Sequence, residues 1–337
     1  MPSIVIVGGM FGDEGKGKIV SYLALKDNPE AAVRGGVGPN AGHTVVYQGS
    51  TYRLRLLPSA VVNEKVKLMI GPGVFIDPSV LMNEIETFRA GSRLVVDRQC
   101  GIIEPEHIMR DKGGHLKEKI STTGTGTGPA NADRVMRIGK LAKDIEILQP
   151  YLGDVALELN RILDKGGLVI VEGTQGTFLS LIHGTYPYVT SKDVCASGIC
   201  SDVGLGPKRV DEVIVVFKSY VTRVGAGPLD NELSMEEIER RGWKEVGTVT
   251  GRVRRAAPFN MELAKRAIML NSATQIALTK IDAVYPECRG IRDYDKLSVE
   301  AKNFIESIEA ECGVRVSLIG TGPDVLDIID RRLNRYR

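Results

Sequence analysis

The chain has 337 residues, of which 43% are apolar and 26% are charged, and its formal net charge is only +2. These values are typical of a globular protein and exclude the large basic surface that nucleic-acid or membrane binding needs. No apolar run is long enough to cross a bilayer, no signal-peptide pattern opens the chain, and the five cysteines lack metal-site spacing. We therefore expect a cytoplasmic protein that binds neither nucleic acid nor membrane.

Short apolar runs typical of buried strands lie at residues 4–7, 67–70, 94–96, 168–171, 213–217, 275–278 and 316–319. Segments of helical period lie at 17–25, 78–90, 147–163, 262–271, 299–311 and 325–333. Residues 44–47 and 51–56 predict a small antiparallel hairpin. The alternation predicts an α/β fold like that of P-loop NTPases, with a mostly parallel central sheet and helices on both faces. No repeat or linker interrupts the pattern, so we expect one domain, residues 1–337, with functional loops inserted.

A glycine-rich loop follows the first strand and leads directly into a helix. It fits the GxxxxGK pattern of phosphate-binding loops and consists of Gly12, Asp13, Glu14, Gly15, Lys16, Gly17 and Lys18. Backbone N–H groups in such a loop and at the helix N-terminus face anionic phosphates, and glycine permits their close approach. The loop therefore predicts binding of a nucleoside triphosphate.

One position departs from the usual phosphate-loop pattern, because Ile19 stands where Ser or Thr ordinarily binds Mg²⁺. Phosphoryl transfer still needs that cation, and the nearest hard oxygen ligand in the loop is the carboxylate of Asp13. A carboxylate among phosphates is costly unless it meets a metal or takes a proton. Asp13 is therefore a candidate metal ligand, a catalytic base or both; in the alternative interpretation it only caps the helix.

A base-recognition motif follows the strand at 275–278, where Thr279, Lys280 and Asp282 fit the pattern [NT]KxD. A carboxylate there accepts two hydrogen bonds from guanine, whereas adenine lacks the matching pair of donors. Together with the phosphate loop, the motif indicates GTP. The turn that contains Gly320 and Gly322 follows the next strand and is placed to close over the base.

Further loops predict a second, anionic substrate. The loop at 121–129 is rich in hydroxyl and N–H groups and suits the phosphate of a nucleoside monophosphate. Gln175 follows another buried strand, and residues 248–255 include three arginines, whose guanidinium groups bind carboxylate or phosphate bidentately. In the alternative interpretation these segments are surface loops and a solvated basic turn.

Among the four histidines, His43 has the most active-site-like setting, in a glycine-rich loop that enters a strand. A structural role for His43 stays open. His107 and His115 lie in charged stretches and are expected at the surface.

In this combination the chain closely resembles the adenylosuccinate synthetases. The resemblance rests on GDEGKGK at Gly12, NAGHT at Asn40, STTGTGTGPA at Ser121, EGTQGT at Glu172, HGTYPYVTS at His183, TGRVRR at Thr250, TKID at Thr279 and GTGPD at Gly320. It implies a Mg²⁺-dependent homodimer that converts GTP, IMP and L-aspartate into GDP, phosphate and adenylosuccinate, the first committed step from IMP to AMP.

The resemblance also implies individual roles. Asp13 resembles a Mg²⁺ ligand and the base that takes the N1 proton of IMP. His43 resembles the acid at the phosphoryl group whose transfer forms 6-phosphoryl-IMP. Lys16 and Gln175 are also implied to be catalytic. The implied GTP-binding residues are Gly12, Glu14, Gly15, Lys16, Gly17, Lys18, Gly42, His43, Thr44, Lys280, Asp282, Gly320 and Gly322, and Gly42 also gives an oxygen to the metal. The implied IMP-binding residues are Asp13, Asn40, Thr123, Arg137, Gln175, Thr190 and Arg252. Arg137, in the helix after the 121–129 loop, reaches the partner subunit's IMP phosphate. The implied aspartate-binding residues are Thr248, Val249, Thr250, Arg252 and Arg254.

Two departures from the family pattern stand out. The chain is shorter than many members, and Val249 stands where many carry a second threonine, so one aspartate contact is absent or made by backbone. Two other classes remain as alternatives: a GTP-binding switch, which leaves the second anion loop and the arginines unexplained, and a simple GTP-dependent kinase.

Overall fold

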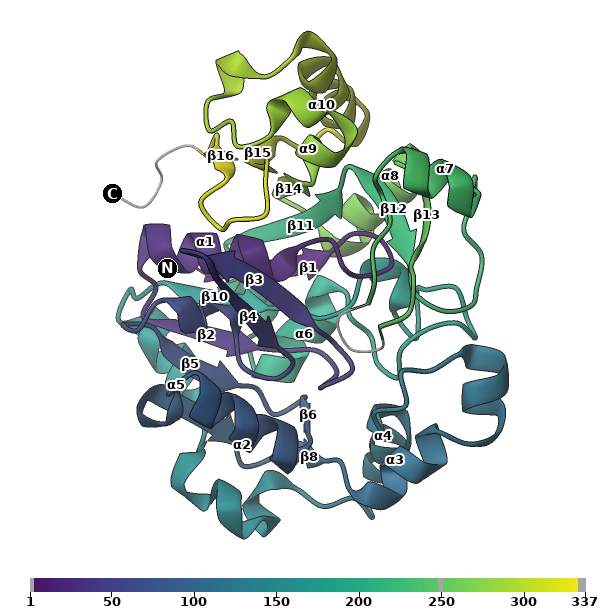
Figure 1. Ribbon diagram of the computed structural model, residues 1–337. Helices are drawn as coiled ribbons and strands as arrows, with labels where there is room; N and C mark the ends of the chain where they lie inside the picture. Colours follow the sequence, from purple (N-terminus) through teal and green to yellow (C-terminus); the bar gives the residue numbers. More distant parts are fainter. Residues whose placement is uncertain (1–2, 248–250, 333–337) are drawn as a thin grey trace.

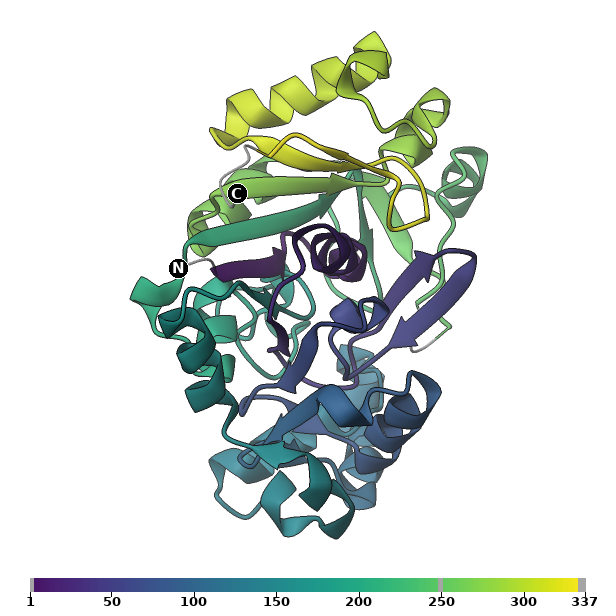
Figure 2. The same ribbon diagram turned by 90° about the vertical axis from the view of Figure 1, so that its left-hand side faces the viewer.

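A central sheet organises the computed structural model, which describes residues 3–247 and 251–332. Ten of its strands follow the order β16-β15-β14-β11-β1-β10-β2-β5-β7-β9, and all pair in parallel except β15 with β16. They are β1 (Ser3–Gly8), β2 (Ala31–Arg34), β5 (Lys67–Ile70), β7 (Leu94–Asp97), β9 (Leu152–Gly153), β10 (Val169–Glu172), β11 (Glu212–Lys218), β14 (Gln275–Thr279), β15 (Val316–Gly320) and β16 (Ile328–Asp330). In Figure 2 the purple strand β1 lies between the green and yellow strands above it and the blue strands below. The predicted parallel sheet is confirmed.

Helices cover both faces of this sheet (Figure 1). In β1, Ile4 and Ile6 belong to the apolar cluster of α1 and α2, whereas Val5 and Val7 belong to the cluster of α5, α6, α8 and α10. Because both faces are buried, the strands appear in the sequence as continuous apolar runs. The helices are α1 (Lys16–Asp27), α2 (Pro78–Thr87), α3 (Pro105–Asp111), α4 (Thr127–Val135), α5 (Val155–Asp164), α6 (Ala196–Val203), α7 (Met235–Arg240), α8 (Met261–Asn271), α9 (Ile281–Val284) and α10 (Val299–Cys312). Within the described ranges, none of them is long and apolar enough to span a membrane.

Short two-stranded sheets accompany the central one. The predicted hairpin is confirmed as β3 (His43–Tyr47) and β4 (Ser50–Leu54), whose connecting residues Gln48 and Gly49 both take a positive φ, as tight hairpin turns require. A second antiparallel pair joins β12 (Tyr220–Arg223) to β13 (Arg255–Pro258), and a short parallel pair joins β6 (Phe75–Ile76) to β8 (Gly101–Ile102).

Three element predictions need correction. The helix predicted at 325–333 is wrong, because residues 328–330 instead pair with β15 as strand β16 and bury Ile328 and Ile329 at the sheet edge. The helix predicted at 147–163 begins only at Val155, since Pro150 cannot continue an α-helix and Asp154 caps the new one. Strand β2 is absent from the prediction because two of the three residues in its apolar run are alanines, which have little preference for strands.

Candidate active site

The loops after β1, β2, β10 and β14 border one cavity of about 790 Å³. This edge, at the carboxyl ends of the strands, is where open parallel sheets bind ligands. Of the predicted site residues, its lining includes Gly12, Asp13, Gly15, Lys16, Gly17, Lys18, Asn40, Gly42, His43, Thr44, Thr123, Gln175, Thr190, Arg254, Lys280 and Gly322. Among the described residues, Glu14, Arg137, Arg252, Asp282 and Gly320 are predicted site residues that do not line it. Thr248, Val249 and Thr250 lie outside the described residues.

Glu14 holds the phosphate loop in shape. Its buried carboxylate accepts the backbone N–H groups of Met10, at 3.0 Å, and Gly12, at 2.7 Å, and the Nζ of Lys16 at 2.9 Å. Gly12 and Asp13 both have a positive φ, a conformation that glycine adopts freely and aspartate tolerates. Hydrogen bonds to the Glu14 carboxylate therefore stabilise the conformation of the phosphate loop.

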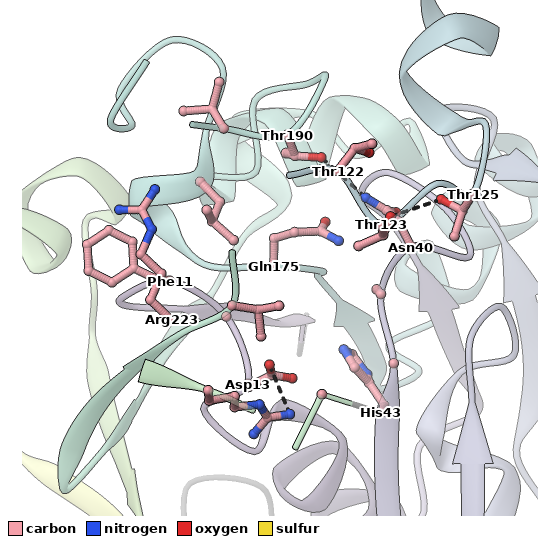
Figure 3. A pocket seen from close by; sticks show the side chains of 18 of the residues that line it. Phe11, Asp13, Asn40, His43, Thr122, Thr123, Thr125, Gln175, Thr190 and Arg223 are labelled. Atoms are coloured by element: carbon pink, nitrogen blue, oxygen red, sulfur yellow. Dashed lines mark hydrogen bonds and ion pairs between the residues drawn. The ribbon is translucent and has the colours of Figure 1, made fainter. Parts of the chain in front are cut away.

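Asp13 is the acidic residue of the loop that faces the cavity (Figure 3). Its side chain is 27% exposed, and one oxygen lies 3.0 Å from the guanidinium of Arg254. Burial raises the pKa of Asp13, while the positive charges of Arg254, Lys218 and Lys16 oppose the rise. Gly15 occupies the N-cap of α1, and no described side chain caps it, so the helix-capping alternative for Asp13 is wrong.

The phosphate loop is bonded directly to the predicted base-binding end. Lys18 donates through Nζ to the carbonyl oxygens of Gly322, at 2.5 Å, and Asp327, at 2.9 Å. The hydroxyl of Thr279, at the end of β14, donates to the carbonyl of Glu14 at 2.6 Å. Burial lowers the pKa of Lys18 to about 8. The two halves of the predicted GTP site therefore lie together.

His43 begins β3, and its side chain and that of Asp13 point into the same part of the cavity (Figure 3). Only 7% of the side chain is exposed, and Nδ1 contacts both Glu172 and Arg34. Burial, reinforced by the positive charge of Arg34, lowers the pKa of His43 to about 4. The ring is therefore neutral at neutral pH in the unliganded protein.

Polar side chains from three loops gather in the part of the cavity around Gln175 (Figure 3). Asn40 donates to the hydroxyl of Thr190 at 3.4 Å, and the hydroxyls of Thr123 and Thr125 lie 3.2 Å apart. Within the described ranges, Asn40 Oδ1 and Gln175 Oε1 are buried with no hydrogen-bond partner. Buried polar atoms are rarely left unpaired, so these two amides are placed to meet a ligand.

The predicted guanine-binding residues follow β14 directly. Lys280 has a positive φ, and its Nζ lies 3.3 Å from Glu245 Oε1. In the part of the chain that the structure describes, Asp282 Oδ1 is buried without a hydrogen-bond partner. A buried carboxylate oxygen with unused capacity is suited to the paired donors of guanine.

The two arginines predicted to bind aspartate have different contacts. Arg254 pairs with Asp13 at 3.0 Å and also with Glu245, while its Nε, among the described residues, is buried without a partner. Arg252 donates to the carbonyl oxygens of Ser121, at 2.9 Å, and Thr122, at 3.2 Å. Arg254 thus contacts the phosphate loop at Asp13, and Arg252 contacts the 121–129 loop at Ser121 and Thr122.

Two sequence predictions about side-chain placement are wrong. Arg137 lies beyond α4 rather than within it, because the helix closes with a left-handed residue at Arg137 and a bond from the N–H of Ile138 to the carbonyl of Asp133. His107 is buried rather than at the surface, since its Nδ1 accepts the N–H of Glu104 at 2.9 Å and its Nε2 lies 3.1 Å from Asp133.

Four charged residues beside the site were not found from the sequence: Arg34, Glu172 and Lys218, which are buried, and Glu245, whose side chain is 13% exposed. Arg34 and Glu172 touch His43, and Glu245 accepts from Lys218 at 3.0 Å beside Arg254. Three of the four are the last residues of central strands, namely Arg34, Glu172 and Lys218. A charged residue that ends a buried apolar run is the signal that would have found them.

A metal at Asp13 would depend on substrate oxygens. Among residues 3–247 and 251–332, no group of three or more Asp, Glu, His or Cys side chains is arranged to hold a metal ion. Mg²⁺ commonly takes one or two protein ligands and fills its remaining positions with phosphate and water oxygens. Asp13, together with Gly42 on the same cavity, fits that pattern.

Known proteins resemble this chain over almost its whole length. The sequence model of adenylosuccinate synthetase matches residues 5–146 and 140–286. Identity is 56% over 336 residues with the adenylosuccinate synthetase of Pyrococcus sp. (strain ST700), covering 98% of this chain and 99% of that protein. It is 56% over 332 residues with that of Methanocaldococcus jannaschii, covering 97% and 96%. The solved structure of fully ligated adenylosuccinate synthetase from Plasmodium falciparum superposes with a TM-score of 0.91 at 26% identity, over 98% of this chain and 99% of that one.

Proposed function

The chain belongs to the adenylosuccinate synthetase family of GTP-dependent ligases, which join IMP to L-aspartate, and we propose that it does so through 6-phosphoryl-IMP. One observation carries the proposal: Asp13 in the phosphate loop and His43 on β3 point into the same part of one cavity. Asp13 can take a proton, and His43 can stabilise a phosphoryl group during its transfer.

The proposed reaction has two steps. Asp13 takes the N1 proton of IMP, O6 attacks the γ-phosphorus of GTP, and GDP leaves, with His43 at the transferring phosphoryl group. The amine of aspartate then attacks C6, loses a proton, and expels O6 as inorganic phosphate. The first step is needed because a purine oxo group leaves poorly until it is phosphorylated, and the phosphorylated substrate divides one difficult step into two easier ones.

Buried polar atoms without partners in the described part of the chain support this substrate placement at Asp282, Asn40, Gln175 and Arg254. Asp282, with Lys280 and Gly322, would hold guanine, and the phosphate loop would hold the triphosphate. Asn40, Thr123, Gln175 and Thr190 would hold IMP. Arg252 and Arg254 would hold aspartate. Mg²⁺, when bound at Asp13 and the carbonyl of Gly42, would neutralise the β- and γ-phosphate charge.

We also propose a homodimer in which Arg137 reaches the partner subunit's IMP phosphate. Arg137 is exposed and does not line the cavity of its own chain, as far as the described residues show. Its neighbours Val135, Met136 and Ile138 are 66%, 69% and 74% exposed. Clustered large apolar side chains at a surface are typical of a protein interface.

Complementation tests the dimer. Arg137→Leu and Asp13→Asn are each expected to be inactive alone, but a mixed dimer has one site with both native residues and regains activity. If Arg137 served its own subunit, no mixed dimer would contain an intact site, and mixing would restore nothing.

One assay tests the function itself. GTP, Mg²⁺ and IMP are mixed with and without aspartate, and the purine absorbance change of adenylosuccinate is followed together with phosphate release. We expect adenylosuccinate only with all substrates present. Equal phosphate release without IMP and aspartate would indicate a GTP switch, and a stable phosphorylated product without aspartate would indicate a kinase.

A further inference from the structure

A buried ion pair lies against His43. Arg34 ends β2 and Glu172 ends β10, the two are partners in the sheet register, and Arg34 NH1 lies 2.8 Å from Glu172 Oε1. Their side chains are 1% and 0% exposed. Removing two charges from water costs free energy that the pairing seldom returns in full, so stability alone does not explain the pair.

Donor groups converge on one oxygen of this pair. Glu172 Oε1 accepts hydrogen bonds from Arg34 NH1 at 2.8 Å and from the hydroxyl of Ser59 at 2.6 Å, and Nδ1 of His43 contacts the same oxygen. The other oxygen, Oε2, accepts the backbone N–H of Ser59 at 2.6 Å. The carboxylate is therefore held in one orientation from both ends.

The contact between the Glu172 carboxylate and Nδ1 of His43 is favourable only when a proton lies between the two atoms. Burial by itself raises the pKa of Glu172, but the charge of Arg34 and the surrounding hydrogen bonds lower it to about 2. The carboxylate is therefore ionised and can only accept hydrogen bonds. Arg34 NH1, 2.7 Å from Nδ1, offers a competing arrangement in which Nδ1 accepts. That arrangement would press the bare lone pair of Nδ1 against the carboxylate oxygen, which is repulsive.

We propose that Glu172 is a positioning residue that binds the Nδ1–H of His43, so that Nε2 is the nitrogen that faces the transferring phosphoryl group and, when it carries a proton, donates to it. The inference rests on the proposed function, which gives His43 its place at that group. Among the described residues, Arg34, Ser59 and Glu172 do not line the cavity, so they act through His43. A carboxylate that fixes the tautomer of a catalytic histidine is a recurrent device.

The tautomer can be measured without turnover, because the chain has only four histidines. In ¹⁵N-labelled, unliganded enzyme at neutral pH, two-bond ¹⁵N–¹H correlations distinguish the protonated ring nitrogen from the bare one, and the His43→Asn spectrum assigns the signal. We expect Nδ1 to carry the proton. A proton on Nε2 alone would overturn the inference, whether or not the enzyme makes adenylosuccinate; failure to make it would contradict only the proposed function.

Variants separate positioning from folding. Glu172→Gln is expected to lower kcat by on the order of 10²-fold or more, with little change in KM for GTP and IMP, and to shift His43 away from the Nδ1–H tautomer. Glu84→Gln is the matched control, because Glu84 is another buried carboxylate that accepts three backbone N–H groups, those of Arg55, Leu56 and Leu57. Its kcat and His43 tautomer should stay at wild-type values, and equal loss of kcat in both variants would contradict the inference.

A milder substitution covers the case in which Glu172→Gln does not fold. Ser59→Ala keeps the ion pair and removes one hydroxyl donor from Oε1. We expect it to lower kcat several-fold and to mix the two tautomers of His43. An unchanged tautomer together with a lowered kcat would contradict the inference.

Discussion

The two sides of the cavity differ in how their charges are satisfied. On the phosphate-loop side, Glu14 and Glu172 each accept several donors from within the fold. On the arginine side, Arg254 is shared between Asp13 and Glu245, which also pairs with Lys280. Glu14 of the phosphate loop and the strand-end residues Arg34 and Glu172 build the first side, whereas loop residues together with Lys218, which ends β11, build the second.

We therefore expect folding alone to fix the side chains on the phosphate-loop side of the cavity. We expect those on the arginine side to rearrange when the substrates bind. If Arg254 binds the aspartate carboxylate, as we propose, it must give up its contact with Asp13 or Glu245 or use its Nε, which is buried without a partner among the described residues. We therefore expect substitutions on the fixed side to lower kcat and substitutions on the arginine side to raise KM for aspartate.

The largest effect is expected at Asp13, where the two sides meet. Asp13→Asn should lower kcat by about 10³–10⁴-fold, because the amide cannot take the N1 proton, while GTP affinity changes only a few-fold. Steady-state turnover and equilibrium binding of GTP measure the two quantities. Substantial residual turnover would remove Asp13 from the role of base.

A somewhat smaller loss tests the fixed side. His43→Asn should lower kcat by about 10²–10³-fold while IMP still binds, because the amide replaces the ring only as a polar contact. His107→Asn is the control: this histidine is also buried and hydrogen-bonded, but outside the cavity, so stability should fall and kcat should not. Loss of IMP binding alone in His43→Asn would favour a positioning role.

The arginine side should respond through KM. Arg254→Lys replaces a fork of donors by a point charge, so KM for aspartate should rise by about 10–100-fold with a smaller change in kcat. Arg255→Lys is the neighbouring control, because Arg255 does not itself line the cavity and pairs with Glu232. A larger rise in KM for GTP than for aspartate would contradict the division into two sides.

The smallest predicted effect is a pH dependence of GTP binding. Burial lowers the pKa of Lys18 to about 8, so its positive charge is present below that pH and is lost as the pH rises through it. GTP affinity should therefore fall by on the order of tenfold between about pH 7 and about pH 9. Lys18→Arg, which keeps its charge, should show a flatter profile. Identical profiles would mean that Lys18 acts through its bonds to Gly322 and Asp327.

The sequence predicted the sheet better than the site. Apolar runs located seven of the central strands because both faces of the sheet are buried, and the glycine-rich loop located the phosphate site because its pattern is local. Strands β2, β9 and β16 were missed because β2 consists of two alanines, a valine and an arginine, and the other two strands have only two or three residues. The contact of Glu172 with His43 escaped because 129 positions separate them, and only the order of the strands brings them together.

The most direct test of the proposed intermediate follows the oxygen at C6 of IMP. With IMP labelled by ¹⁸O at O6, the two-step reaction predicts that each phosphate released with adenylosuccinate carries one labelled oxygen, read by mass spectrometry. Water labelled with ¹⁸O should place none in that phosphate. Phosphate without the IMP label, or with oxygen from water, would contradict formation of 6-phosphoryl-IMP.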